Sequence, residues 1–179
     1  MKSIFFNNKS NKYKEKPEKV REKMRKIKTD VSNNIIKNIN NHVEQVKVIN
    51  KLYLGEEFAE RKFIIGELKT KVNSYKQQDI KKDFHEIENL ITLDDIIEKL
   101  VASKLKCYYC NKNLLLLFDK VRDMDQWTLD RLNNYDEHTK DNTIISCLKC
   151  NLQRRRKNSE KFKFTKQLET NQLRINKLM

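Results

Sequence analysis

The chain contains few of the residues that form tight turns, with two glycines and one proline in 179 residues. An all-β sandwich needs many such turns, so this scarcity favours helices. Long apolar runs are also missing, because no stretch approaches the ~18 residues that cross a membrane. The apolar patch near the start, Ile4–Phe6, is too short for a signal peptide. We therefore expect an intracellular protein without a membrane partner.

Charge is distributed unevenly along the chain, whose net charge is +14. Residues 1–30 carry 11 Lys/Arg against 4 Asp/Glu, and residues 151–179 carry 9 against 2, so each end has a net charge of +7. Residues 31–150 are neutral overall. Basic ends of this kind are typical of proteins that bind a polyanion. Nucleic acid is favoured over a membrane because apolar anchors are missing near these ends. A solvated, Lys-rich surface without any partner is the alternative.

The first half of the chain has the apolar spacing of amphipathic helices. Residues 31–54 and 56–78 repeat apolar side chains at steps of three and four, which places them on one face of a helix. Gly55 separates the two stretches, where it can end the first helix. We expect residues 1–87 to form a basic, mostly helical region. Its helices within 31–78 offer a surface for a dimer or a protein partner.

All four cysteines fall in two C-x-x-C pairs, Cys107 with Cys110 and Cys147 with Cys150. Each pair offers two thiolates to one tetrahedral ion from a single turn, and the two pairs together complete a four-thiolate site. A structural zinc ion is therefore the expected cofactor. An iron–sulfur cluster and simple buried cysteines are the alternatives. Disulfides would need an oxidising compartment, which nothing in the sequence suggests.

The 36 residues between the two cysteine pairs exceed what a plain zinc ribbon holds. "QWTLDRL" and "TIISC" have the composition of strands, and the polar stretch between them has that of a loop. The residues from Leu148 onward have a helical composition. We expect residues 88–165 to form a zinc-bound domain of strand, loop, strand and helix. An N-capped helix from Thr92 precedes the strands, and a tail of helical composition, residues 166–179, follows the domain.

Residues 105–165 resemble the HNH endonucleases, also called ββα-metal or His-Me finger nucleases. The resemblance is carried by the paired cysteines, by Asp130, by Asn142 in "HTKDN" and by Asn151 directly after "CLKC". The subgroup with paired C-x-x-C knuckles, which includes phage junction-resolving endonucleases, is the most similar. The resemblance implies an α+β fold, in which a helical N-terminal arm precedes a small zinc-bound ββα-metal domain. Several features at compatible spacing are more specific than one short motif.

The resemblance also implies roles for individual residues. Asp130 and Asn151 match the ligands of a catalytic divalent ion, Mg²⁺ or Mn²⁺, and Asn142 matches an asparagine that orders the loop. The basic run that follows on the expected helix would present cations to nucleic-acid phosphates. A solvated helix face is the alternative for this run, which consists of Arg154, Arg155, Arg156 and Lys157.

One position departs from the family's pattern. Where these nucleases have a general-base histidine, this chain has Arg131, which stays protonated near neutral pH and is a poor base. Arg131 would then bind a phosphate oxygen or stabilise the transition state. The base would be a metal-bound hydroxide or His138, the one histidine of the expected zinc domain. A loop-packing role, with a bond to backbone, is the alternative for His138.

Together these features favour a metal-dependent endonuclease that hydrolyses phosphodiester bonds of nucleic acid, with DNA as the expected substrate. A catalytically inert zinc-bound module that binds nucleic acid on the same fold is the second interpretation. A third is a structural or transcription-associated zinc protein whose helices within 31–78 bind a protein. Cleavage separates the first interpretation from the others, and salt-sensitive binding separates the second from the third.

Overall fold

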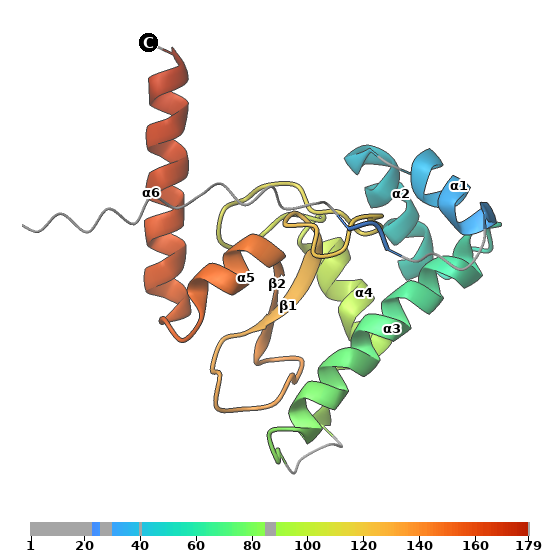
Figure 1. Ribbon diagram of the computed structural model, residues 1–179, viewed down its shortest axis with the longest axis horizontal. Helices are drawn as coiled ribbons and strands as arrows, with labels where there is room; N and C mark the ends of the chain where they lie inside the picture. The colour runs from blue at the N-terminus through green and yellow to red at the C-terminus, as the bar shows by residue number, and fades with distance from the viewer. Residues whose placement is uncertain (1–22, 26–29, 40, 85–88, 179) are drawn as a thin grey trace, which may run out of the picture.

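The computed structural model describes residues 23–25, 30–39, 41–84 and 89–178, so most of the basic residues 1–30 lie outside this part. Within it the fold is mixed α+β, with six helices and one two-stranded sheet, as the sequence predicts. Figure 1 shows how these elements are arranged. In chain order they are α1 (Asp30–Asn38), α2 (His42–Tyr53), α3 (Arg61–Ile80), α4 (Leu93–Ala102), β1 (Trp127–Arg131), β2 (Thr143–Cys147), α5 (Leu148–Arg154) and α6 (Ser159–Leu178).

One cluster of buried apolar side chains joins the helices to the sheet. Ile49 of α2, Ile64 of α3 and Ile96 of α4 are fully buried, and Leu129 of β1 belongs to the same cluster. Burial of apolar surface stabilises such packing by roughly 25 cal/mol per Å². The expected domain boundary near residue 88 adjoins residues outside the described part and stays a prediction.

The first amphipathic stretch contains two helices, so the prediction of one helix over residues 31–54 was wrong. α1 ends at Asn38, and α2 begins at His42. Between them the side-chain oxygen of Asn41 accepts a hydrogen bond from the Glu44 N–H at 2.9 Å. An asparagine in this N-cap position satisfies a free N–H of the first turn and starts a new helix.

The end of α2 agrees with the sequence. Gly55 has a φ of +72°, in the left-handed region that glycine adopts at little cost. Tyr53, which the spacing places on the apolar face, is instead 56% exposed, and Val43 and Leu54 are also exposed. A dimer or protein partner on helices within 31–78 stays a prediction.

The helix expected at Thr92 is confirmed as α4. The Asp95 N–H donates to Thr92 Oγ1 at 3.2 Å, and the Thr92 N–H donates to Asp95 Oδ2 at 3.1 Å. This reciprocal capping box fixes the start of the helix. α4 packs against α2 and leads directly to the first cysteine pair.

The two expected strands are confirmed as an antiparallel pair, with Trp127 opposite Cys147 and Asp130 opposite Ile144. All five residues of β1 are buried, so the strand lies inside the fold. Leu132, the last residue of "QWTLDRL", lies beyond the end of β1 and is 37% exposed. Because β2 ends at Cys147, the second cysteine pair spans the junction between β2 and α5.

The helix expected from Leu148 through the basic run is interrupted. α5 ends at Arg154, and Arg155 has a φ of 53°, which no continuing α-helix contains. α6 starts afresh at Ser159, includes residues 166–178 and extends away from the rest of the fold (Figure 1). Among the described residues, every helix falls short of the length and apolarity that a bilayer crossing requires.

Candidate functional site

The two cysteine pairs form one cluster. Cys107 and Cys110 follow α4, Cys147 ends β2, and Cys150 lies in α5. The four sulfur atoms all lie within 4.8 Å of one another, and Cys110 Sγ is 4.0 Å from Cys147 Sγ. A tetrahedral zinc ion with Zn–S bonds of about 2.3 Å keeps its sulfurs ~3.8 Å apart. The cluster can therefore hold a metal ion such as zinc.

The surroundings of the sulfurs also suit a metal. The Cys147 N–H donates to Cys107 Sγ and the Cys150 N–H donates to Cys147 Sγ, each at 3.3 Å. Such bonds stabilise and orient thiolate ligands. Hydrogen bonding with Cys107 lowers the pKa of Cys110 and raises the pKa values of Cys147 and Cys150. Four thiolates this close need a cation between them to ionise together.

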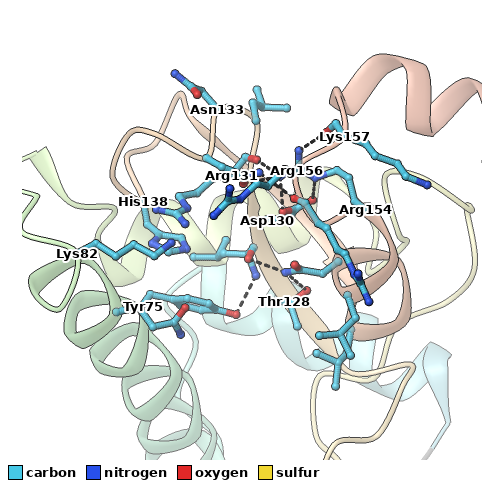
Figure 2. A pocket seen from close by; sticks show the side chains of 18 of the residues that line it. Tyr75, Lys82, Thr128, Asp130, Arg131, Asn133, His138, Arg154, Arg156 and Lys157 are labelled. Carbon is cyan, nitrogen blue, oxygen red and sulfur yellow. Dashed lines mark hydrogen bonds and ion pairs between the residues drawn. The ribbon is translucent and has the colours of Figure 1, made fainter.

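A cavity of about 740 Å³ lies between the C-terminal half of α3, β1, the β1–β2 loop and the turn after α5. Figure 2 shows the side chains that line it. Asp130, Arg131, His138 and Asn151 all contribute to this lining, and Asn142 does not. One carboxylate, that of Asp130, stands there against seven lysine and arginine side chains: Lys71, Lys82, Arg131, Arg154, Arg155, Arg156 and Lys157. Arg131 and Arg154 have carboxylate partners, so the exposed side chains of Arg155, Arg156 and Lys157 are best placed to attract an anion such as phosphate.

Asp130 is buried against Arg154. Arg154 Nε donates to Asp130 Oδ2 at 2.6 Å, and Arg154 Nη2 donates to Asp130 Oδ1 at 2.8 Å. The Tyr109 hydroxyl donates to Oδ2 of the same carboxylate at 2.6 Å. Nη1 donates to the Lys157 carbonyl, and Nη2 also lies within hydrogen-bond distance of the Arg131 carbonyl and of Asn134 Oδ1. Arg154 is only 1% exposed, so this two-pronged ion pair lies in the interior.

Arg154 stays charged inside the fold. Burial alone would lower the pKa of Arg154, but the hydrogen bonds and charge of Asp130 outweigh burial, and the net shift is upward. Burial, helped by the charge of Asp130, raises the pKa of Tyr109, so its hydroxyl stays a hydrogen-bond donor. The carboxylate is thus fully engaged by side chains of the protein.

Asp130→Ala is expected to lower the free energy of unfolding by ~3–5 kcal/mol, because it leaves the buried Arg154 guanidinium unpaired. Chemical denaturation of the zinc-loaded protein measures the loss. Asp141→Ala removes an exposed carboxylate at the end of the β1–β2 loop. It is the control, and it is expected to change the free energy of unfolding by less than ~0.5 kcal/mol. Equal stability of the two variants would contradict a structural role for the pair.

Arg131 contacts the β1–β2 loop, α3 and the residues that follow α3. Its Nη1 donates to the carbonyl of Asp136 at 3.0 Å and lies 3.6 Å from Asp79 Oδ1. The guanidinium lies over the ring of Phe84, 5.5 Å from its centroid. Arg131 is therefore a buried cation whose position in the cavity wall is fixed by several contacts.

His138 is held by the carboxylate of Asp79. Its Nδ1 lies 2.8 and 2.9 Å from the two Asp79 oxygens, and its backbone N–H donates to Asp79 Oδ2 at 2.9 Å. The ring packs against Tyr75, with 4.9 Å between centroids. Because a carboxylate only accepts hydrogen bonds, Nδ1 carries the hydrogen, and a neutral ring keeps its lone pair on Nε2.

The protonation state of His138 follows from its burial. Burial lowers its pKa below the ordinary 6.5, although the charge and hydrogen bond of Asp79 act in the opposite direction. The ring is therefore neutral at neutral pH, with a carboxylate that fixes its tautomer. A neutral imidazole with a fixed tautomer can accept a proton at Nε2. The imidazole contacts a carboxylate, whereas the alternative reading from the sequence had it bond backbone.

Asn142 closes the β1–β2 loop from outside the cavity. Its Oδ1 accepts from the Asn133 N–H at 2.8 Å, and its Nδ2 donates to the carbonyls of Asn133 at 3.0 Å and Glu137 at 2.8 Å. These three bonds join the two ends of the loop that carries His138. Asn142 therefore orders the loop and does not line the cavity.

Asn151 ties α5 to β1, because its Nδ2 donates to Thr128 Oγ1 at 3.2 Å and to the Leu129 carbonyl at 3.1 Å. A catalytic Mg²⁺ or Mn²⁺ does not fit Asp130 and Asn151 as the side chains are arranged. Such hard cations need several free oxygen ligands. Those of Asp130 are already engaged by Arg154 and Tyr109.

The basic run has one buried and three exposed members. Arg154 is inside the fold, bound to Asp130. Arg155, Arg156 and Lys157 are exposed and lie in the turn between α5 and α6, where they line the cavity. These three can reach a ligand from a turn, whereas the sequence places all four on one helix.

The contribution of α3 to the cavity was missed from the sequence. Asp79 lies 59 residues before His138. Lys71 of the same helix has its Nζ 4.4 Å from the centroid of the Trp127 ring, and burial lowers its pKa to about 7. The spacing of residues 56–78 identified the helix, but no local signal shows which strand or loop such a helix meets.

Comparisons of the chain with protein-family models, with curated proteins and with solved structures find no match. The functional conclusion therefore rests on the residues and geometry of the site.

Proposed function

We propose that the protein is an endonuclease that cleaves phosphodiester bonds of nucleic acid, with DNA as the expected substrate and the cavity as its active site. One observation carries the proposal: a neutral histidine, His138, oriented by Asp79, lines a cavity that is surrounded by lysine and arginine side chains. Such a cavity suits phosphate, and such a histidine suits proton abstraction.

In the proposed reaction, His138 Nε2 takes a proton from a water molecule whose oxygen bonds to phosphorus. The bond from phosphorus to the leaving oxygen breaks, and this oxygen gains a proton from solvent. Arg131 and Arg156 stabilise the negative charge on the non-bridging oxygens. Asp79 holds the imidazole in one tautomer and stabilises its protonated form.

The order of strand, loop, strand and helix around a four-cysteine cluster agrees with the resemblance to the HNH nucleases, although Asp130 and Asn151 are not available as the metal ligands that the resemblance implies. We assign a structural zinc ion to the four-cysteine cluster, where it would fix β2 and α5 beside the cavity. The divalent ion expected from the resemblance is not part of the proposal, because Arg154 already neutralises Asp130.

Incubation of the zinc-loaded protein with supercoiled plasmid and with a labelled RNA strand tests the proposal. Relaxed or linear plasmid is the expected product. Buffers with and without added Mg²⁺ or Mn²⁺ show whether an ion contributes. If the protein binds plasmid and RNA but leaves both intact in every buffer, the nuclease proposal is contradicted and the second candidate is favoured.

That second candidate is a catalytically inert zinc-bound module that binds nucleic acid. The Asp130–Arg154 ion pair favours it, because the carboxylate that the resemblance assigns to catalysis is occupied. The cavity cations would then serve binding alone.

Both candidates imply binding that weakens with salt. Replacing Arg155 and Arg156 together by alanine is expected to make the slope of log affinity against log salt less negative by up to ~1.8. Each phosphate contact contributes about −0.9 to this slope. Fluorescence anisotropy of a labelled duplex at several salt concentrations measures the slope. Lys37 and Lys62 are exposed lysines outside the cavity lining, and their double alanine variant is the control. Equal slopes for the two double variants would exclude the cavity rim as a phosphate-binding surface.

A further inference from the structure

The β1–β2 loop carries an exposed aromatic side chain at the cavity. Tyr135 is 79% exposed, yet it lines the same cavity as Arg155 and Arg156. Single exposed aromatic residues are common on protein surfaces. The informative feature here is an aromatic ring beside exposed cations, because ring and cations together match the base and the phosphates of one nucleotide chain.

The backbone around Tyr135 is fixed by hydrogen bonds. The Tyr135 N–H donates to Asn133 Oδ1 at 3.1 Å, and Asn133 Nδ2 donates to Asp136 Oδ2 at 2.5 Å. The Asn133 N–H in turn donates to Asn142 Oδ1 at 2.8 Å. A loop that is ordered before a ligand arrives loses less conformational entropy on binding.

Asn134 connects this loop to the basic turn after α5. Its Nδ2 donates to the carbonyl of Arg155 at 2.8 Å, and its Oδ1 accepts from Arg154 Nη2 at 2.9 Å. Tyr135, the next residue, is thereby kept beside the exposed cations of the turn. Figure 2 shows Asn133, Arg156 and Lys157 on the loop and turn that border the cavity.

We propose that Tyr135 is a stacking platform for an unpaired nucleobase whose flanking phosphates lie on Arg155 and Arg156. The preferred ligand is then single-stranded or locally unpaired nucleic acid. The inference rests on the proposed function in that it takes nucleic acid as the ligand. A base inside a duplex has both faces covered by its neighbours, whereas an unpaired base offers a free face to a tyrosine ring.

Binding of one sequence as a single strand and as a blunt duplex, measured by fluorescence anisotropy, tests the inference. Tyr135→Ala is expected to weaken single-strand binding by about 5- to 150-fold, the usual range for loss of one stacked base, and to leave duplex binding unchanged. Tyr135→Phe keeps the ring and is expected to bind as the wild type does. Tyr53→Ala removes another exposed tyrosine, on α2, and is expected to change neither affinity.

A strand with 2-aminopurine in place of one base adds a second readout. Stacking is expected to quench its fluorescence with the wild type and Tyr135→Phe, but not with Tyr135→Ala. Equal affinity of Tyr135→Ala and wild type for the single strand, or an equal loss for both ligands, would overturn the inference. Failure of the wild type to cut nucleic acid would refute the nuclease proposal but leave the stacking result valid, so the two failures are distinguishable.

Discussion

Removal of metal from the four-cysteine cluster is expected to abolish the cooperative unfolding of the region around β1, β2 and α5. A structural zinc site contributes on the order of 10 kcal/mol or more to folding, whereas a whole domain is stable by only ~5–15 kcal/mol. The cluster joins the residues after α4 to the junction of β2 and α5. Its loss would therefore release elements that border the cavity, and nucleic-acid binding should fall with it.

Calorimetry of the zinc-loaded protein before and after chelation measures this effect. Cys107→Ser and Cys150→Ser each remove one thiolate and should act in the same direction. Ser103→Ala, a change beside α4 but outside the cluster, is the control and should keep both the zinc and the transition. Addition of zinc to the chelated wild type should restore the transition. A metal-free preparation that melts as the loaded protein does would contradict a structural role for the ion.

The elements predicted from the sequence are those whose signals act over a few residues. Thr92 caps α4, Gly55 follows α2 with a positive φ, and "TIISC" forms β2. Capping groups, β-branched runs and C-x-x-C pairs all work through near neighbours, so one sequence displays them. For the same reason, the sequence predicts both cysteine pairs and the two strands between them.

The sequence misled where a helix ends inside a continuing apolar pattern, and where residues far apart in the chain meet. The apolar spacing continues through residues 39–41, although Asn41 starts a new helix there. Arg155 adopts a positive φ, which an arginine in the sequence does not predict. The pairing of Arg154 with Asp130 spans 24 residues, and that of His138 with Asp79 spans 59. Which charges meet in the interior depends on tertiary packing, which spacing along the chain does not reveal.

His138→Gln is expected to slow cleavage by ~10²–10⁴-fold, the usual contribution of a general base. Glutamine keeps a polar side chain beside Asp79 but cannot accept the proton at neutral pH. Asp79→Asn should also slow cleavage, because the amide no longer selects the tautomer with hydrogen on Nδ1. His138→Gln removes no cation of the cavity, so its nucleic-acid affinity should be kept. Asp79→Asn also removes the carboxylate beside Arg131, so its free energy of unfolding is measured together with its rate.

The pH dependence has a definite sign. A general base must be neutral, so the rate should fall as pH drops through the pKa of His138. Burial places that pKa below 6.5, so the wild-type rate should persist from neutral pH to below this value before it declines. A rate that already falls above pH 6.5 would point to a different base.

Single-turnover cleavage of one labelled nucleic acid by the wild type, His138→Gln and His42→Gln is the most direct test of the proposed site. His42 lies outside the cavity lining, with its Nε2 3.1 Å from the Leu105 carbonyl oxygen, so its variant controls for loss of a histidine as such. Affinity is measured in parallel by anisotropy. The proposal predicts cutting by the wild type and His42→Gln at similar rates, and a loss of at least ~100-fold for His138→Gln at unchanged affinity. Cleavage by His138→Gln at the wild-type rate, or a wild type that binds but cuts nothing, would contradict it.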